Sequence, residues 1–431
     1  MTEMTRRTLF GTTAALAGSA GLAGTAMAAG IQQEPAALRG AVENGQVNLP
    51  PLHAASEANS EPANPMPPGK RLGIAVVGLG NLALEEIIPA FGQAKHVRLA
   101  ALVSGNPEKA RIIGAQYGVD ANSLYDYANF DRIRDNPAID IVYIVLPNSM
   151  HSDFTARAAA AGKHVLCEKP MATSVAEAQH MIAACRSAGR KLMIAYRLQY
   201  DPAHRTAIGF ARSGKFGKIR MIQASNGQND AANGQWRQIK AMAGGGSLPD
   251  VGLYCTNAFR YLTGEEPIEV TGQMTYPSGD KRFSQIEDVS LFTMRFPSGI
   301  IATGNAGYSF HESRLLRVQA ETGWFGLDPA FGYDNLALQI NRKEGKASGL
   351  ETRRFTPHSQ FANEMDAFAL SLHNNATPLT PGEEGLQDMR ILEAIYQSAA
   401  GGSPVKFAAV TGHDVTRGAW PKQLGSYIPA V

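Results

Sequence analysis

Short, unbroken runs of apolar residues alternate with helical segments in the first half of the chain. The runs have the length and the apolar character of strands buried on both faces, and they lie at 72–77, 97–103, 139–146, 163–167 and 191–196. The helical segments between them lie at 82–91, 107–117, 151–161 and 174–188. This alternation predicts an α/β Rossmann domain, a doubly wound parallel sheet, over residues 71–196.

A different pattern begins after residue 197, where longer segments alternate between apolar and polar positions. These predicted strands lie at 219–224, 268–276, 289–296, 300–308 and 315–321, with a hairpin turn at 297–299. Helices are predicted at 251–262, 360–373 and 383–399. Residues 197–431 are therefore predicted to form an α+β domain for substrate binding and oligomerisation. Its large, mostly antiparallel open sheet should carry helices on one face.

The first 70 residues lack this periodicity. Arg6 and Arg7 precede a charge-free stretch that ends in the small-residue motif Ala26-Met27-Ala28, which is typical of a twin-arginine signal peptide over residues 1–28. An uncleaved membrane anchor is the alternative. Residues 29–70 form a Pro-rich arm. We expect a periplasmic protein that the twin-arginine machinery exports folded, without stable membrane association.

Charge and cysteine content narrow the class of protein. The formal net charge is +2 and no run of Lys or Arg stands out, which argues against nucleic-acid binding. The three cysteines, Cys167, Cys185 and Cys255, lie in apolar contexts. They are therefore expected to be buried free thiols, and no metal site is expected.

The sequence Gly-Leu-Gly-Asn-Leu-Ala at 78–83 directly follows the first predicted strand and precedes a helix. Gly78 permits a tight turn, and Gly80 lets a pyrophosphate approach the N–H groups of the helix start. The second strand ends without an acid at its tip, and Ser104 and Lys109 follow. They favour the 2′-phosphate of NADP over NAD, although Lys109 could also be an ordinary solvated residue.

Polar residues follow the next strands at the same sheet edge, where cofactors lie in such folds. Asn148 is a candidate ligand of the ribose or nicotinamide, whereas His151 has either a binding role or none beyond starting a helix. Lys169, in Glu168-Lys169-Pro170, can hydrogen-bond a substrate hydroxyl and stabilise the developing alkoxide.

The glycine-rich segment 244–254 ends in Asp250 and Tyr254, which are four residues apart and face the same side of a helix. A tyrosine near a lysine is a suitable proton acceptor for alcohol oxidation, and Asp250 could orient sugar hydroxyls. The alternative is an N-capping Asp and a core Tyr. Together these motifs indicate a nicotinamide-dependent oxidoreductase that acts on a sugar or polyol.

Three of these segments, Gly78-Leu79-Gly80, Glu168-Lys169-Pro170-Met171-Ala172 and 244–254, resemble the Gfo/Idh/MocA oxidoreductase family over residues 70–425. Most members have His where Tyr254 stands, and the Tyr resembles the founding member. The resemblance implies an enzyme with tightly bound NADP that oxidises an aldose to its lactone. It would then reduce fructose or another sugar to a polyol in ping-pong fashion.

The resemblance also implies roles for single residues. Lys169, Asp250 and Tyr254 would be catalytic, with Tyr254 as the acid/base. The cofactor-binding residues expected from the motifs and the resemblance together are Gly78, Gly80, Asn81, Leu82, Ser104, Lys109, Tyr127, Leu146, Asn148, His151, Glu168, Lys169, Arg197, Trp236, Arg237 and Tyr333.

The assembly and the substrates follow from the resemblance only as expectations. The arm would cover the adenine side of a neighbouring subunit's cofactor in a homotetramer, or in a dimer. An aldose–aldose oxidoreductase, or a sugar dehydrogenase with dissociable NAD(P), would keep the same cofactor residues. A non-redox sugar-binding protein or glycosidase is a third reading.

Overall fold

The computed structural model describes residues 42–43, 46–47, 70–229, 235–344 and 347–408. The predicted signal peptide and nearly all of the predicted arm lie outside these residues. Of the arm, the structure describes a short antiparallel pair, β1 (Val42–Glu43) with β2 (Gln46–Val47). No helix in the described part of the chain is long and apolar enough to cross a membrane.

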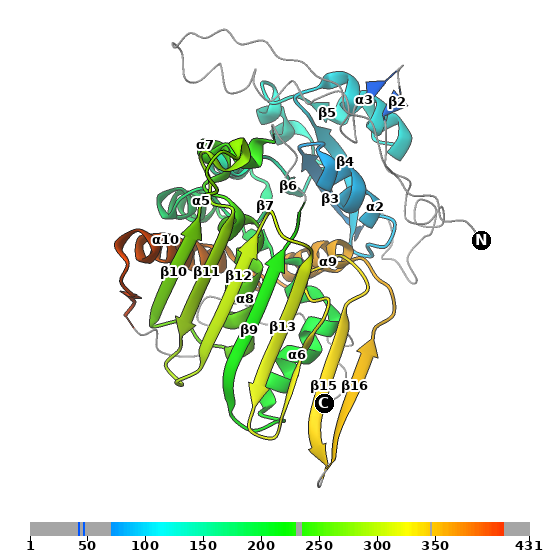
Figure 1. The fold of residues 1–431 in the computed structure, drawn as a ribbon. Helices are drawn as coiled ribbons and strands as arrows, with labels where there is room; N and C mark the ends of the chain where they lie inside the picture. Colours follow the sequence, from blue (N-terminus) through cyan, green and yellow to red (C-terminus); the bar gives the residue numbers. More distant parts are fainter. Residues whose placement is uncertain (1–41, 44–45, 48–69, 230–234, 345–346, 409–431) are drawn as a thin grey trace, which may run out of the picture. The chain divides into compact units, whose positions relative to one another are not determined.

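Six parallel strands form the first sheet, in the order β5-β4-β3-β6-β7-β8 (Figure 1). They are β3 (Leu72–Val77), β4 (Val97–Val103), β5 (Leu124–Tyr125), β6 (Ile141–Ile144), β7 (His164–Glu168) and β8 (Leu192–Ala195). This order is that of a doubly wound dinucleotide-binding sheet, so the predicted Rossmann fold is confirmed. Sequence analysis missed β5, because a strand of two residues carries no periodic signal.

Helices cover both faces of this sheet. They are a π-helical turn (Ala83–Ile87) that continues into α2 (Ile88–Ala90), α3 (Pro107–Tyr117), α4 (His151–Ala160) and α5 (Val175–Ser187). One apolar cluster joins α4 and α5 to the sheet, and a second cluster joins α2 and α3 to its other face. Val47 of β2 packs against the second cluster.

Nine strands form the second sheet, in the order β16-β15-β14-β13-β9-β12-β11-β10-β17 (Figure 1). They are β9 (Ile219–Gly227), β10 (Glu269–Thr275), β11 (Val289–Arg295), β12 (Ile301–Gly307), β13 (Ser313–Ala320), β14 (Gly323–Leu327), β15 (Ala337–Glu344), β16 (Ala347–Arg354) and β17 (Val405–Lys406). Only β9 and β12 pair in parallel within it, which confirms the mostly antiparallel sheet.

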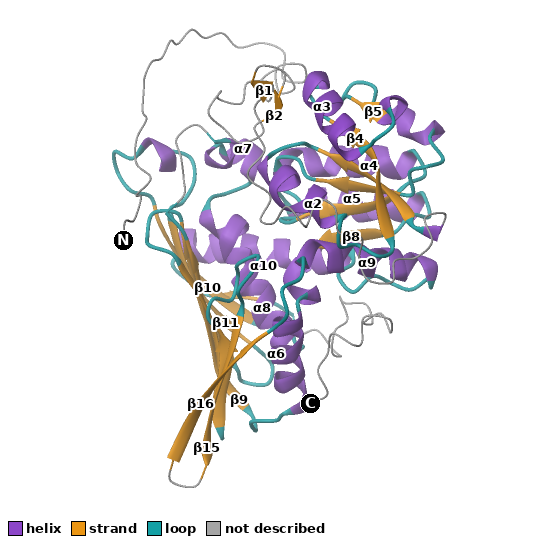
Figure 2. Ribbon diagram, turned by 90° about the vertical axis from the view of Figure 1, so that its right-hand side faces the viewer, coloured by secondary structure: helices purple, strands orange, loops and turns teal. Residues whose placement is uncertain are grey.

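The remaining helices are α6 (Pro202–Ser213), α7 (Lys240–Ala243), α8 (Leu253–Thr263), α9 (Gln360–His373) and α10 (Gly382–Gly401). Figure 2 shows α6, α8 and α10 along one face of the second sheet, as expected. Sequence analysis missed α6, although its boundary signals are present: Asp201 caps it, Pro202 begins it and Gly214 ends it. In contrast to the expectation, α9 does not join them. Its Phe361, Met365 and Phe368 pack against the first sheet.

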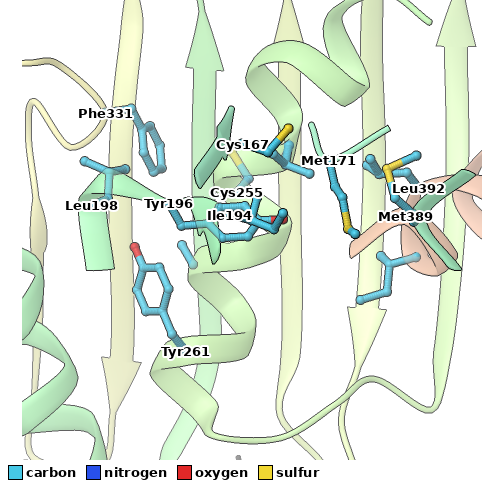
Figure 3. Close-up of a cluster of buried hydrophobic side chains, with 14 of the residues drawn as sticks. Cys167, Met171, Ile194, Tyr196, Leu198, Cys255, Tyr261, Phe331, Met389 and Leu392 are labelled. Atoms are coloured by element: carbon cyan, nitrogen blue, oxygen red, sulfur yellow. The ribbon is translucent and has the colours of Figure 1, made fainter. Parts of the chain in front are cut away.

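The two sheets share one apolar core. Cys167, Met171 and Ile194 from the first sheet region belong to the same buried cluster as Cys255 and Phe331 from the second (Figure 3). All three cysteines are buried free thiols, as predicted. Because close-packed cores resist deformation, this cluster fixes the strand ends of the first sheet against α8.

Candidate active site

Lys169 stands at the carboxyl end of β7 and reaches across to the turn before α8. Its Nζ donates hydrogen bonds to the backbone oxygen of Asp250, at 2.9 Å, and to the Oδ1 of that residue, at 3.2 Å. The same ammonium lies 4.6 Å from the centre of the Tyr254 ring. The fold therefore joins the three residues predicted to be catalytic, although about 80 positions separate them in sequence.

Asp250 lies in a π-helical turn, Leu248–Gly252, and its carboxylate meets three donors. Besides Lys169, Oδ2 receives the hydroxyl of Tyr308 at 2.6 Å and the Nε of Arg237 at 3.3 Å. Burial alone would raise the pKa of Asp250, but Lys169 and Arg237 outweigh it and lower the pKa to about 2. The carboxylate is thus ionised at neutral pH, and the N-capping alternative does not describe it, because Gly252 precedes α8.

Lys169 is likewise charged at neutral pH. Burial would lower the pKa of Lys169, but the attraction of Tyr254, Asp250 and Glu168 raises it above the usual range for lysine. Only 12% of the side chain is exposed. A buried, oriented ammonium of this kind is suited to stabilise an alkoxide that forms beside it.

Tyr254, in the first turn of α8, is flanked by two cations. Its hydroxyl lies 3.4 Å from the Nη2 of Arg197, whose guanidinium is 5.1 Å from the ring centre. Lys169 faces the ring as well. Because Arg197 lies beside the hydroxyl and Lys169 faces the ring, this hydroxyl is well placed to exchange a proton with a substrate.

Arg197 also fixes the segment that follows β14. Its guanidinium donates to the backbone oxygens of Phe331 and Gly332, both at 2.9 Å, and to the side chain of Gln360. It stacks 4.4 Å from the ring centre of Tyr333. Tyr333 is 45% exposed, so it lines the site at its open side.

The loop after β3 fits a pyrophosphate. Gly78 has φ 96°, and a Cβ there would lie 2.4 Å from the backbone oxygen of Val145, so only glycine fits. A Cβ on Gly80 would meet no protein atom within 4 Å, so the space above the loop is open. Asn81 is exposed and Leu82 half-buried, and no side chain caps the turn that follows. The backbone N–H groups at the start of this turn can therefore bind an anion.

The end of β4 carries the two residues predicted to hold a 2′-phosphate. Ser104 and Lys109 are both buried there, and the ring of Tyr127 covers Gly105 so closely that a Cβ would lie 2.9 Å from it. The acid in this turn, Glu108, is bonded to the side chain of Arg111 at 2.9 Å. The carboxylate of this turn is thus paired with a cation, which lessens its repulsion of an anionic ligand.

Three further predicted residues follow β6, namely Leu146, Asn148 and His151, the last of which begins α4. Asn148 donates its amide to the backbone oxygen of Ala243 at 2.8 Å, and thereby ties the dinucleotide edge to α7. His151 is fully buried, with Nδ1 3.0 Å from the backbone oxygen of Pro170 and Nε2 2.9 Å from that of Leu146. These are the contacts of a residue that holds two loops together.

Glu168 belongs to a buried carboxyl pair beneath Lys169. The hydroxyl of Tyr143 lies 2.8 Å from Glu168 and 3.2 Å from Glu364, and one O–H can donate to only one of them. Burial raises the pKa of Glu168, and burial together with Glu168 raises that of Glu364 well above its usual value. We therefore expect this pair to retain a proton at neutral pH.

Trp236 contacts the site indirectly. The guanidinium of Arg237, which pairs with Asp250, lies 4.6 Å from the centre of the Trp236 ring. Apart from His151, which is fully buried and bonded to backbone oxygens, the predicted residues form two groups. Those brought together around Asp250 and Tyr254 are Glu168, Lys169, Arg197, Trp236, Arg237 and Tyr333. Those along the dinucleotide edge are Gly78, Gly80, Asn81, Leu82, Ser104, Lys109, Tyr127, Leu146 and Asn148.

The sequence patterns do not reveal several supporting residues, namely Tyr143, Glu287, Tyr308, Gln360 and Glu364. Glu287 accepts the backbone N–H groups of Gly246, at 2.9 Å, and Leu248, at 2.8 Å, and so holds the glycine-rich loop in place. None of these residues belongs to a motif, and each acts through a partner far away in sequence. The one local signal was an acid, Glu287, at the start of an apolar strand.

Comparison with known proteins shows which family has this architecture. The family model described as "Oxidoreductase family, NAD-binding Rossmann fold" matches residues 72–196, and the "GFO/IDH/MocA C-terminal domain" matches residues 204–325. The chain belongs to the Gfo/Idh/MocA oxidoreductase family. The resemblance drawn from its motifs is therefore confirmed, and its first domain is an NAD(P)-binding domain.

Named relatives of this family member are enzymes. An aldose–aldose oxidoreductase from Caulobacter crescentus, solved with glycerol, is 44% identical and has a TM-score of 0.75; the match covers 78% of this chain and 100% of that one. A D-xylose 1-dehydrogenase [NADP(+)] from Haloarcula marismortui is 29% identical, over 77% of this chain and 92% of its own. A levoglucosan dehydrogenase solved with NADH and L-sorbose, at 22% identity and a TM-score of 0.68, covers 79% of this chain and 100% of its own and shows the shared fold.

Proposed function

We propose that this family member is an NADP-dependent sugar oxidoreductase that transfers a hydride from one sugar to another through tightly bound NADP. An aldose would be oxidised to its lactone, and a second sugar, fructose or another, would then be reduced to a polyol, as in glucose–fructose oxidoreductase. The observation that carries the proposal is the arrangement of Lys169, Asp250 and Tyr254 at the carboxyl edge of the first sheet.

The residues supply proton transfer and charge stabilisation. When bound, NADP supplies the site that accepts and returns the hydride. As the hydride leaves the carbon of the donor sugar, the deprotonated phenol oxygen of Tyr254 would accept the hydroxyl proton of that sugar, and Lys169 would stabilise the negative oxygen. In the second half-reaction Tyr254 returns the proton to the carbonyl oxygen of the acceptor. Each half-reaction balances without a further reactant.

The excess of positive charge supports NADP as the cofactor. At the catalytic end, Lys169 and Arg237 pair with the carboxylate of Asp250, and Arg197 lies 3.4 Å from the hydroxyl of Tyr254. At the adenosine end, the buried Ser104 and Lys109 follow β4, and no acid stands at the tip of that strand. The xylose dehydrogenase relative is NADP-dependent by name, which agrees with this preference.

A second candidate is supported by identity rather than by geometry. The 44% identical relative is an aldose–aldose oxidoreductase, so the acceptor here could be an aldose instead of fructose. A sugar dehydrogenase with dissociable NADP is a third, supported by the xylose dehydrogenase relative. The retained proton-transfer residues count against a non-redox sugar-binding protein or glycosidase.

We also propose a periplasmic location, export by the twin-arginine pathway and a homotetramer or dimer. The outer face of the second sheet, opposite the helices, carries exposed apolar side chains, Leu291 at 47% and Ile301 at 48%. Exposed apolar residues on an open sheet favour a partner surface, and a second copy of the chain would cover it.

The first test uses the purified, extensively dialysed protein and the near-ultraviolet absorbance of NADPH. The proposal expects a rise when glucose is added and a fall when fructose follows, with no cofactor supplied. A fall with a second aldose but not with fructose would favour the aldose–aldose candidate. A response that needs added NADP would favour a dissociable-cofactor dehydrogenase, and no response to any sugar would contradict the proposal.

A further inference from the structure

Tyr308 directly follows β12 and points its hydroxyl at the catalytic carboxylate. The hydroxyl lies 2.6 Å from Oδ2 of Asp250 and 3.3 Å from the backbone oxygen of Gly246. The residue is 4% exposed, so this hydroxyl is not a general contact with solvent. A buried, short hydrogen bond to a carboxylate belongs to the stronger class of such bonds.

The rest of Tyr308 is held rigidly. Its ring packs in a small apolar cluster with Val251, Phe283, Ile286 and Ala306. Its backbone N–H donates to the carboxylate of Asp288 at 3.2 Å. The position of the hydroxyl is therefore set by packing and by a backbone bond, and the tyrosine can act as a fixed reference for Asp250.

The two carboxylate oxygens of Asp250 have different partners. Oδ1 faces Lys169, whereas Oδ2 faces Tyr308 and the half-exposed Arg237. Arg237 is 41% exposed at its side chain and lies at a longer distance, so Tyr308 is the firmer of the two anchors. Without it, the carboxylate could rotate away from Lys169, whose ammonium would keep its bond to the backbone oxygen of Asp250 but lose the bond to Oδ1 that helps to set its direction.

We infer that Tyr308 is a positioning residue of the reaction, which fixes Asp250 so that Asp250 keeps Lys169 aimed at the substrate oxygen. This inference rests on the proposed function and deepens it. Burial and the neighbouring Asp250 raise the pKa of Tyr308 well above its usual value, so the hydroxyl remains a donor. No sequence motif marks Tyr308, and its role appears only in the folded chain.

The test compares Tyr308→Phe with Tyr261→Phe in the full-length protein. Each change removes one buried hydroxyl; that of Tyr261 bonds His204 at 2.7 Å and does not touch Asp250. We expect kcat for sugar oxidation to fall about 10- to 100-fold in Tyr308→Phe, with KM and NADP content nearly unchanged. Tyr261→Phe should keep its kcat. Unchanged turnover in Tyr308→Phe would overturn the inference.

A double-mutant cycle separates positioning from general damage. If Tyr308 acts through Asp250, the loss caused by Tyr308→Phe should disappear in an Asp250→Ala background. An equal loss in both backgrounds would contradict the inference.

A second readout needs no substrate. Loss of the Tyr308 bond removes one group that lowers the pKa of Asp250, so the acid unfolding midpoint of Tyr308→Phe should move to higher pH than that of Tyr261→Phe. Equal midpoints would count against the inference. Because this readout is independent of sugar turnover, it distinguishes a failure of the inference from a failure of the proposed function.

Discussion

Two of the charged clusters in the described part of the chain differ in burial and in charge balance. The buried cluster consists of Arg260 with Glu266, Glu384 and Asp388, at 2.6, 3.0 and 2.7 Å. The catalytic cluster consists of Asp250 with Lys169, Arg237 and Tyr308. The side chains of the buried cluster are at most 4% exposed, whereas Lys169 and Asp250 are 12% and 17% exposed.

Their charge balance is opposite. In the buried cluster, one cation faces three acids, so burial and the neighbouring Glu384 raise the pKa of Asp388 to about 6 even though Arg260 opposes this. The catalytic cluster gathers two cations around one carboxylate, which is therefore ionised. The same residue types thus serve two ends. In the buried cluster, every charged group is paired and shielded from solvent, and the ion pairs hold α8 to α10. In the catalytic cluster, the partly exposed cations can bind anions and stabilise an alkoxide.

The largest effect should come from Arg260→Met, which leaves three buried acids without their cation. We expect the free energy of unfolding to fall by about 3–5 kcal/mol, measured by denaturant unfolding. The control is Arg295→Ala, because Arg295 pairs with Glu269 at 3.2 Å on the surface and should cost less than about 1 kcal/mol. Similar losses in the two variants would show that burial does not separate the clusters as argued.

Tyr254→Phe tests the open cluster through its chemistry. Removal of the phenol oxygen that exchanges the proton should lower kcat about 10²- to 10⁴-fold, while folding and bound NADP persist. Tyr276→Phe is a matched control, since Tyr276 is 58% exposed and should leave kcat unchanged. Turnover of Tyr254→Phe at the wild-type rate would remove Tyr254 from the mechanism.

The pH dependence of stability distinguishes the ionised Asp250 from an ordinary acid. Its pKa in the folded state, about 2, lies below the ordinary value of 3.8, so its contribution is present above pH 3.8 and is lost as the pH falls towards 2. The difference in unfolding free energy between wild type and Asp250→Asn should therefore shrink by about 2 kcal/mol over that range. A constant difference from neutral to acid pH would contradict the assignment.

The smallest effect is expected at the rim of the catalytic cluster. Arg237 is 41% exposed, so its ion pair with Asp250 is screened by solvent. Arg237→Ala should change the free energy of unfolding by less than about 1 kcal/mol. The measurement is thermal unfolding of wild type and Arg237→Ala, each with and without NADP. It gives the change in stability and the part of it that depends on the cofactor. A loss as large as that of Arg260→Met would place Arg237 in a buried network.

The sequence by itself determined the elements that depend on local chemistry. Continuous apolar runs predicted five strands of the first sheet, and the turn at Gly78 required glycine for its φ of 96°. The chemistry of Lys169, Asp250 and Tyr254 was also accessible, because strand ends and helix spacing place side chains by local rules. Strand β16 escaped prediction because all eight of its residues are exposed, so its pattern lacks apolar alternation.

Only the tertiary structure decided which distant residues meet. It placed α9 against the first sheet, brought Arg197 to the hydroxyl of Tyr254, and set Tyr308 on Asp250, 58 positions away. Such contacts leave no periodic trace, because each depends on the packing of elements that are remote along the chain. The sequence motifs predicted which side chains react, and packing around the shared apolar core determined how those side chains are oriented.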